Sequence, residues 1–518
     1  MLVDEIGEAA AGLPRQRSPW LDALPSRLLL ADLPPAPPTG TSVVLPWGLE
    51  DVPAEQRQRV RTLGLDRDGH LLVVGAARSG RSQLMHTLAG AAAALSPADL
   101  HLYAVDCGNG ALAALHHLPH CGAVVTRAEP ERAARLLGRL RAEADWQRSE
   151  LALSGFADVA EQRARSPARS RFPHLLLLLD RWEGFAETLG EVDGGALTDL
   201  VLGLLREGAS VGVHVVLTGD RSLAAARLSS LTDSKVVLRM ADRADVSLLG
   251  LRPRQLPGEQ PPGRAVAVDS GREVQTALLV ADPGSQAQAA TLEELGRLVG
   301  ERFPDVPAHQ RPFRVDGLPA SVGLDAALAR VLAVAGGSGL YLPFGLGGDE
   351  LDLVGVDLDR TPAAVVAGPA RSGRSTLLCF QARALLAQGT QVVLAAPHPS
   401  PLRELAGLPG VRAVPTGADA SLEQWQAAPA GDGRVVVLVD DGEALVDSPA
   451  GPLLAALARR QSGRGLVLTG HPDRLGTGFT GWQVEVKRAR QGALLSPQDL
   501  LSGDLVVLRL PRSAMGVR

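Results

Sequence analysis

Two nearly identical segments, GAARSGRSQLM at residues 75–85 and GPARSGRSTLL at residues 368–378, decide the fold of this chain. Each fits the pattern G-x4-G-[K/R]-S, follows an apolar stretch typical of a strand and precedes a helical stretch. In such a loop, successive backbone N–H groups and the start of the next helix form a concave anion site, and the glycines let phosphate oxygens approach. The sequence therefore predicts two phosphate-binding loops.

The rest of the two halves repeats in the same order. LPWGL at 45–49 recurs as LPFGL at 342–346, and residues 106–126 align without a gap on residues 396–416. Self-similarity over such a long period indicates a duplicated structural unit. We infer that the chain is a tandem duplication with one phosphate-binding loop in each copy.

Each copy alternates short apolar strands with helical stretches. This pattern predicts an α/β fold with two tandem domains, each a mainly parallel sheet flanked by helices. The predicted strands of the first copy are 70–74, 101–106, 122–126, 174–180, 213–218, 235–240, 264–268 and 276–280. Those of the second copy are 363–367, 391–396, 411–416, 434–440, 465–470, 482–486 and 504–510.

The composition of the connecting stretches divides the chain into four predicted segments. Residues 1–44 form an N-terminal extension with a Pro-rich connector, and 45–283 form the first phosphate-loop domain. Residues 284–319 form a helical linker, and 320–518 form the second domain. A length of 518 residues suits two such cores.

The composition excludes several classes of protein. With 45% hydrophobic and 21% charged residues the chain is globular, and a net charge of −5 gives no basic footprint for tight nucleic-acid binding. The longest apolar run, at 175–179, is far shorter than a membrane-spanning helix. The first residues lack a signal-peptide pattern, and three scattered cysteines fit a reducing compartment. We expect a cytoplasmic protein.

Each copy also offers a magnesium site. Asp180 and Asp440 end apolar strands, where a P-loop ATPase needs an aspartate, and the hydroxyls of Ser82 and Ser375 would join the same Mg²⁺. Each aspartate is followed by a strand ending in Thr-Gly, the place for a polar group near the γ-phosphate. The alternative is that each aspartate merely caps the next element. The predicted nucleotide-binding residues are Gly75, Arg78, Ser79, Gly80, Arg81, Ser82, Gly368, Arg371, Ser372, Gly373, Arg374, Ser375 and Thr376.

Four further segments carry a family resemblance: 106–120 (DCGNGALAALHHLPH), 212–221 (GVHVVLTGDR), 236–253 (VVLRMADRADVSLLGLRP) and 261–266 (PPGRAV). With the two loops, they resemble FtsK/SpoIIIE-type ATPases, most closely the C-terminal ATPase pair of the EccC/EssC motors of type VII secretion. The resemblance implies a RecA-like core in each half, ATP and Mg²⁺ as ligands, and a homo-oligomer or ring that moves a polymer. It also implies partner subunits in a membrane-associated motor, a cytoplasmic location at the inner face of the membrane, and protein rather than DNA as cargo.

The loops depart from this family pattern at one position. Arg81 and Arg374 stand where a lysine is normal, in a chain whose only lysines are Lys235 and Lys487. Arginine is bulkier and planar, so the exchange is not conservative. We expect nucleotide binding to survive and fast turnover to be lost.

The residues expected to activate water also depart from it. An acid should follow the strand-end aspartate, but the first copy has Arg181 and the second has Asp441. Glu183 and Glu443 lie close by and are the other candidate bases. The candidate catalytic residues are therefore Asp441, Glu183 and Glu443, and we expect slow or absent hydrolysis.

Three alternatives stay open at this stage. The chain could be a DNA translocase, or a scaffold that binds nucleotide without turnover. Arg239, Arg243 and Arg252 are candidate arginine fingers, with ordinary surface arginine as the alternative.

A zinc site is not favoured, because the second copy forms the aligned segment without any of the possible ligands, which are Cys107, His116, His117, His120 and Cys121.

Overall fold

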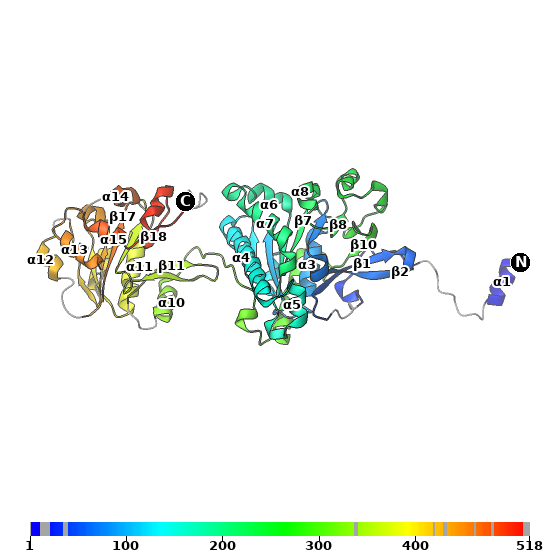
Figure 1. The fold of residues 1–518 in the computed structure, drawn as a ribbon, viewed down its shortest axis with the longest axis horizontal. Coiled ribbons are helices and arrows are strands. Elements are labelled where there is room, and N and C mark those ends of the chain that lie inside the picture. The colour runs from blue at the N-terminus through cyan, green and yellow to red at the C-terminus, as the bar shows by residue number, and fades with distance from the viewer. Residues whose placement is uncertain are drawn as a thin grey trace. The chain divides into compact units, whose positions relative to one another are not determined.

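The structure is a computed structural model that describes residues 2–10, 21–34, 40–335, 340–417, 420–427, 433–459, 463–477 and 481–510. The chain divides into two compact units, Met1–Val315 and Asp316–Arg518 (Figure 1). Most of the Pro-rich connector, residues 35–39, lies outside the described residues. The N-terminal helix α1 covers Leu2–Ala10.

The first unit contains a ten-stranded sheet in the order β2-β1-β10-β9-β8-β3-β7-β6-β4-β5. The six strands from β8 to β5 are parallel, and the four beyond β8 extend the sheet with antiparallel pairs. The strands are β1 Val44–Val52, β2 Arg57–Gly64, β3 Leu71–Val74, β4 Leu100–Asp106, β5 Cys121–Thr126, β6 His174–Asp180, β7 Val213–Gly219, β8 Lys235–Leu238, β9 Arg264–Ala267 and β10 Arg272–Thr276. The helices are α2 Leu65–Asp68, α3 Arg81–Ala92, α4 Pro130–Ser154, α5 Val159–Arg165, α6 Trp182–Thr188, α7 Ala196–Glu207, α8 Ala226–Ser229 and α9 Ser285–Arg302.

The second unit has a six-stranded parallel sheet in the order β15-β14-β16-β17-β13-β18 and a separate β11–β12 hairpin. Its strands are β11 Tyr341–Gly347, β12 Asp352–Asp357, β13 Ala363–Ala367, β14 Gln391–Ala395, β15 Val411–Ala413, β16 Val435–Val439, β17 Arg464–Gly470 and β18 Gly492–Leu494. Its helices are α10 Leu324–Ala335, α11 Arg374–Ala387, α12 Leu422–Ala427, α13 Gly451–Ala458, α14 Pro472–Thr477 and α15 Trp482–Lys487.

The predicted fold class and the duplication are confirmed. Read from the same edge, β18-β13-β17-β16-β14-β15 repeats β8-β3-β7-β6-β4-β5. The two N-terminal hairpins even share an irregularity of register, between Pro46 and Gly48 in β1 and between Pro343 and Gly345 in β11. Both cores are therefore copies of one RecA-like arrangement.

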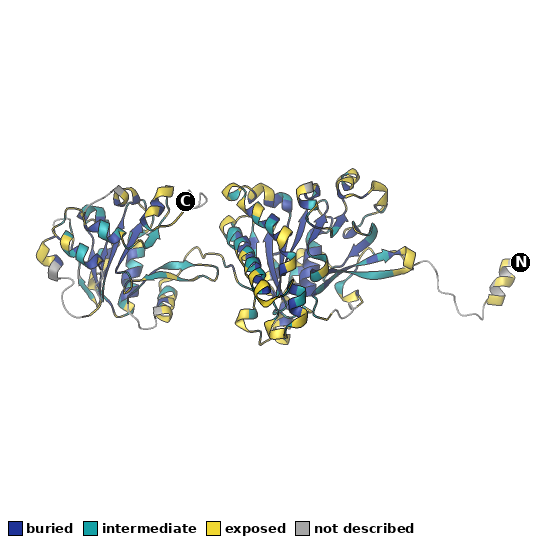
Figure 2. Cartoon of the chain, in the orientation of Figure 1, coloured by how far each residue is buried: buried dark blue, intermediate teal, exposed yellow. Residues whose placement is uncertain are grey.

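Each sheet is buried on both faces, and the inner positions of its central strands are apolar (Figure 2). In β6, Leu175, Leu177 and Leu179 pack with α4, α6 and α7, while Leu176 and Leu178 pack with α3. In the second unit, α13 and α15 cover one face and α11 covers the other. This packing fixes the carboxyl ends of the parallel strands, where both phosphate loops lie.

The segment predicted as a linker, 284–319, is largely part of the first unit. In α9, Leu292 is fully buried in the core, and a Cβ at Gly296 would collide with the carbonyl of His117. Phe313 stacks on Tyr103 with ring centroids 4.3 Å apart, and Val315 is buried beside it. The structure divides the chain after Val315, whereas the sequence placed the boundary over 284–319.

Three predicted strands are wrong. Residues 482–486 form helix α15, because Trp482 and Val486, four residues apart, bury one helical face. Residues 504–510 begin inside the short 3-10 helix Leu500–Leu505 and expose Val507, while β18 takes the sheet edge beside β13. In the first unit β10 ends at Thr276, at the start of the strand predicted over 276–280.

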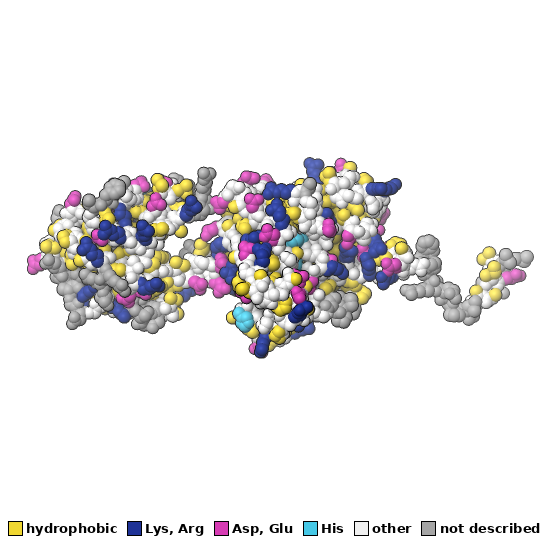
Figure 3. Space-filling view, in the orientation of Figure 1, with side chains coloured by type: hydrophobic (Ala, Val, Ile, Leu, Met, Phe, Trp, Pro, Cys, Tyr) yellow, Lys and Arg dark blue, Asp and Glu magenta, His cyan; other side chains and the backbone are white. Residues whose placement is uncertain are grey.

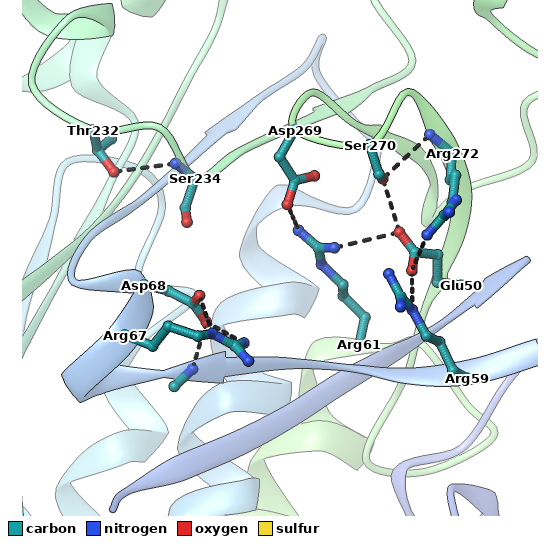
Figure 4. A network of polar contacts seen from close by, with 11 residues as sticks. Glu50, Arg59, Arg61, Arg67, Asp68, Thr232, Ser234, Asp269, Ser270 and Arg272 are labelled. Atoms are coloured by element: carbon teal, nitrogen blue, oxygen red, sulfur yellow. Dashed lines mark hydrogen bonds and ion pairs between the residues drawn. The ribbon is translucent and has the colours of Figure 1, made fainter. Parts of the chain in front are cut away.

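A buried carboxylate joins the N-terminal hairpin of the first unit to its sheet (Figure 4). Glu50 is fully buried in β1 and pairs with Arg59 at 2.5 Å and Arg61 at 3.3 Å from β2, and with Arg272 of β10 at 3.8 Å. Ser270 donates a further hydrogen bond to it at 2.8 Å. Gly347 stands at the repeat-related position, and the β11–β12 hairpin forms its own sheet.

We expect Glu50→Gln to lower the free energy of unfolding of the first unit by about 1 to 2 kcal/mol, because it weakens charge-assisted hydrogen bonds to arginines that are themselves partly exposed. Chemical denaturation measures the change. Glu55→Gln, which alters an exposed pair with Arg57 on the same hairpin, is the matched control and should change stability by much less. Equal effects of the two substitutions would contradict this role of Glu50.

Candidate functional site

Both phosphate loops connect a buried strand to a helix that begins at the arginine. Gly80 and Gly373, the residues before α3 and α11, have φ of 112° and 96°, which strongly favours glycine. A Cβ at Gly75 or Gly368 would collide with the hydroxyl of Ser79 or Ser372, respectively. The glycines of the pattern are thus required by the loop geometry that the sequence predicted.

In the first unit, the loop serine and the strand-end aspartate meet. Ser82 Oγ donates to Asp180 Oδ2 at 2.9 Å, and Thr218 Oγ1, at the end of β7, donates to Asp180 Oδ1 at 2.5 Å. Burial raises the pKa of Asp180, although these two hydrogen bonds act in the opposite direction. A carboxylate and a hydroxyl held together at a loop of this kind suit a hard cation such as Mg²⁺.

The second unit keeps the aspartate but gives it a different hydroxyl. Asp440 accepts from Thr469 Oγ1 at 2.8 Å, as Asp180 does from Thr218, and from Ser400 Oγ at 2.6 Å. The structure records no hydrogen bond between Ser375 and Asp440. Ser400 therefore donates to the strand-end aspartate of the second unit, as Ser82 does in the first unit.

The two unusual arginines pair with the candidate catalytic acids. Arg81 Nη2 lies 3.0 Å from Glu183 Oε1, and its side chain is only 8% exposed. Arg374 Nη2 lies 2.9 Å from Asp441 Oδ1, and its Nη1 lies 3.9 Å from Glu443 Oε1. All three carboxylates predicted to activate water are thus neighbours of a phosphate-loop arginine.

The residue after each strand-end aspartate has a left-handed backbone, with φ of 66° at Arg181 and 47° at Asp441. Arg181 Nε lies 3.6 Å from Glu183 Oε1, so the first site holds two arginines and one carboxylate at these positions. The second holds one arginine and two carboxylates. Burial and the nearby Asp440 raise the pKa of Asp441.

Unsatisfied polar atoms show that these loops fit a phosphate ligand. Ser79 Oγ, Ser372 Oγ, Arg81 Nη1 and Arg374 Nη1 are buried and make no hydrogen bond within the described part of the chain. Of these, Arg374 Nη1 has the distant ion pair with Glu443 at 3.9 Å. Buried polar groups normally make hydrogen bonds, so donors without one at a loop of this shape fit an anion. The residues present therefore fit a nucleotide phosphate.

Other predicted residues lie in less specific surroundings. Arg78 and Arg371 are exposed, with φ of 60° and 65°, and Thr376 is exposed at the start of α11. The carbonyl of Arg239 accepts from the loop N–H of Ala76 at 2.8 Å, which places it beside the first loop. Arg243 donates to backbone carbonyls of its own segment.

The sequence missed two contacts of the loops. The backbone N–H of Gly263 donates to the carbonyl of Ser79 at 2.9 Å, so the 261–264 turn abuts the first phosphate loop. Ser400 belongs to the segment aligned with 106–126, where no hydroxyl stands in the first copy at the equivalent Gly110. Only the mismatch between the copies at that position could have drawn attention to it.

No group of three or more His, Cys, Asp or Glu side chains that could hold a metal ion occurs among the residues with described positions. Cys107 is buried, and burial raises its pKa to about 12. Over the same residues, no helix is long and apolar enough to cross a membrane. Acidic and basic side chains are interspersed on the face shown in Figure 3.

Two RecA-like units, each with a phosphate loop, a strand-end aspartate and a Thr-Gly strand, define a protein with tandem P-loop NTPase domains. Residues 41–276 match the model of the FtsK/SpoIIIE family, so the first unit is an FtsK/SpoIIIE-family domain.

The chain's relatives are EccC and EssC proteins of type VII secretion. It is 32% identical to the ESX-4 secretion system protein EccC4 of Mycobacterium tuberculosis, over 70% of this chain and 28% of that protein. It is 29% identical to EccC of Thermomonospora curvata, over 64% of this chain and 25% of that protein. The chain thus spans about a quarter of the length of these two relatives.

Solved structures with the same fold include ATPases 2 and 3 of EssC from Geobacillus thermodenitrificans. That structure matches with a TM-score of 0.71 at 22% identity, over 92% of both chains. ATPases 2 and 3 of Thermomonospora curvata EccC, solved in complex with a signal sequence peptide, match with a TM-score of 0.58 at 23% identity, over 95% of this chain and 96% of that one.

Proposed function

We propose that this chain is the nucleotide-binding part of a type VII-like secretion motor, in which both loops bind ATP with Mg²⁺ and turnover is slow or absent. The observation that carries the proposal is the contact of Ser82 with Asp180 at the mouth of a loop with unpaired donors. The similarity to EccC and EssC proteins supports the assignment to secretion.

The phosphate groups would be held by the loop N–H groups and by Arg81 or Arg374. The Mg²⁺ ion would supply charge neutralisation of the phosphates, with Ser82 and Asp180 as its ligands in the first unit. In the second unit Asp440 is the proposed ligand together with Ser375, whose hydroxyl would have to replace that of Ser400.

Slow turnover follows from the residues around the expected water position. The first site places Arg181 where an acid is normal, and the carboxylate of Glu183 is paired with Arg81. The second site offers Asp441, whose raised pKa suits a base better than an ordinary aspartate. We therefore assign any residual hydrolysis to the second unit.

We further propose a homo-oligomer or ring that works in the cytoplasm with other subunits of a membrane-associated machine. Protein is the proposed cargo, because the T. curvata relative with the same fold was solved with a signal sequence peptide. No described feature favours DNA as the cargo.

We expect ATP with Mg²⁺, at ten times its dissociation constant, to stabilise each unit by about 1.4 kcal/mol, a rise of a few degrees in melting temperature. Replacing Gly80 and Gly373 together by Leu should abolish the rise, because a side chain there blocks the phosphate approach. Thermal unfolding with and without nucleotide measures this.

Gly155→Leu is the matched control, because Gly155 also has a left-handed backbone (φ 73°) but ends helix α4 with open space around it. It should keep the full nucleotide-dependent rise. Absence of any rise in the unmodified chain at millimolar ATP would refute the proposed function.

A further inference from the structure

In each unit a glutamate joins the phosphate loop to the end of the Thr-Gly strand. Glu183 Oε1 lies 3.0 Å from Arg81 Nη2, and Glu183 Oε2 accepts from the backbone N–H of Asp220 at 3.2 Å. Asp220 is the first residue after β7. We call the set Arg81, Glu183 and Asp220 the first clasp.

The second unit has a looser version of this arrangement, in which one oxygen makes both contacts. Glu443 Oε1 accepts from the backbone N–H of His471, the first residue after β17, at 3.2 Å, and lies 3.9 Å from Arg374 Nη1. The nearer partner of Arg374 is Asp441, at 2.9 Å. A Cβ at Gly470 would collide with Glu443 Oε2, so glycine at the strand end makes room for this carboxylate. Arg374, Glu443 and His471 form the second clasp.

The clasps are shielded from solvent. The side chains of Arg81 and Glu183 are 8% and 27% exposed, and those of Arg374 and Glu443 are both 14% exposed. An ion pair so placed is screened less than a surface pair and holds its members in one geometry. The arrangement recurs although the residues around the two glutamates differ, RWEGF in one copy and DGEAL in the other.

Glu183 has both carboxylate oxygens committed, one to a guanidinium and one to a backbone amide. A general base needs an oxygen free to take a proton from water. The catalytic role that the sequence suggested for Glu183 stays a prediction, and the geometry without nucleotide supports a different one. It favours a role that acts through the arginine.

We propose that Glu183 and Glu443 are positioning residues that couple the phosphate-loop arginines to the chain just beyond β7 and β17. A nucleotide phosphate competes with the carboxylate for the arginine. This inference rests on nucleotide binding, the function proposed above. It adds a way in which a bound nucleotide affects the segments that follow β7 and β17.

The competition has a physical consequence at the strand end. When Arg81 turns to a phosphate, Glu183 loses the nearer of its two cations, because Arg181 Nε lies at 3.6 Å, and keeps its bond to the backbone N–H of Asp220. A hydrogen bond to a carboxylate with fewer competing partners is strengthened, so the N–H of Asp220 becomes better protected. A nucleotide bound at the loop thus alters the hydrogen bonding of the segment after the Thr-Gly strand, because the arginine exchanges the carboxylate for a phosphate.

The test uses the full chain with the second loop blocked by Gly373→Leu, and Mg²⁺ with ADP as the probe. ADP is chosen because tighter binding cannot then arise from blocked hydrolysis. Glu183→Gln should tighten ADP binding about tenfold, the factor that corresponds to 1.4 kcal/mol, because the arginine no longer leaves a charged partner. Isothermal titration calorimetry measures the affinity.

Two further variants make the result specific. In the background of Arg81→Ala, Glu183→Gln should leave the affinity for ADP unchanged within twofold, because the competing pair is already gone. Glu187→Gln, which removes an exposed carboxylate from the same helix α6, should also have no effect. If Glu183→Gln does not fold, Glu183→Asp takes its place in the test. The aspartate keeps the charge but is too short to contact both Arg81 and the backbone N–H of Asp220, so ADP binding should tighten by the same factor.

Amide hydrogen exchange supplies a readout that a purely structural ion pair would not move. ADP should slow exchange at Asp220 in the parent protein and leave it unchanged in Glu183→Gln. If ADP binds the parent and Glu183→Gln alters neither the affinity nor the exchange, the inference is wrong and nucleotide binding stands. If the parent protein does not bind ADP, both are wrong.

Discussion

The first unit is expected to unfold between pH 6.5 and pH 4, while the second unit retains its structure over most of that range. His70, His101 and His120 are buried in the first unit, and burial lowers the pKa of each from 6.5 to about 4. In this interval the unfolded chain binds a proton at each histidine and the folded unit does not, so stability falls as the pH falls.

The expected loss is large. At pH 5 each of the three histidines removes about 2 kcal/mol, and the full difference between folded and unfolded pKa is worth about 3 kcal/mol per histidine. Burial raises the pKa of Asp180 and Glu143, which opposes the loss, but His86, His174 and His214 add to it. The sum is comparable with the whole stability of a domain, about 5 to 15 kcal/mol.

Calorimetric unfolding at pH 7, 6, 5 and 4.5 measures this loss. Only His398 and His471 lie in the second unit, so its transition should move much less. His101→Gln, which can keep a hydrogen bond to the carbonyl of Gln310, should shift the acid transition to lower pH, and exposed His116→Gln should not. A first-unit transition that is constant down to pH 4.5 would contradict the argument.

The sequence predicted the local parts of the candidate site. The glycine spacing and the strand-end aspartates are short-range patterns, and the duplication showed each of them twice. The serine pattern did not show that Ser82 contacts Asp180 while Ser400 takes this position at Asp440. The helix α15 was misread because the alternation in WQVEV also fits a helical face with Trp482 and Val486 four residues apart. Burial against the core, which the sequence does not display, decides between the two.

The contacts of the loop arginines could not be predicted in the same way. Arg81 and Glu183 are about a hundred positions apart, and Arg374 and Asp441 are 67 apart. Their contacts depend on the strand order β3-β7-β6 in the first unit and β13-β17-β16 in the second, which brings the ends of these strands together. The sequence showed that both arginines depart from the usual lysine, but only the folded sheet shows which carboxylates they contact.

Replacing each loop arginine by alanine is expected to weaken ATP binding at that loop by about 1 to 3 kcal/mol, roughly five- to 150-fold, the range for losing a charge-assisted hydrogen bond. Arg81→Lys and Arg374→Lys should keep binding within a fewfold, because a cation remains. Each is measured by titration in a chain whose other loop carries the Gly→Leu block.

Turnover should separate the two lysine variants. Arg374→Lys removes the planar guanidinium that pairs with Asp441 while leaving a cation at the loop. Burial and the nearby Asp440 raise the pKa of Asp441, which makes its carboxylate a stronger base than an ordinary aspartate. Arg81→Lys gains no such acid, because Arg181 stands at that position in the first unit. Steady-state phosphate release should therefore rise for Arg374→Lys and stay at the parent level for Arg81→Lys. Brisk release by a chain in which only the unmodified first loop can bind ATP would show that its arginine is compatible with catalysis and that the site is not restricted to binding.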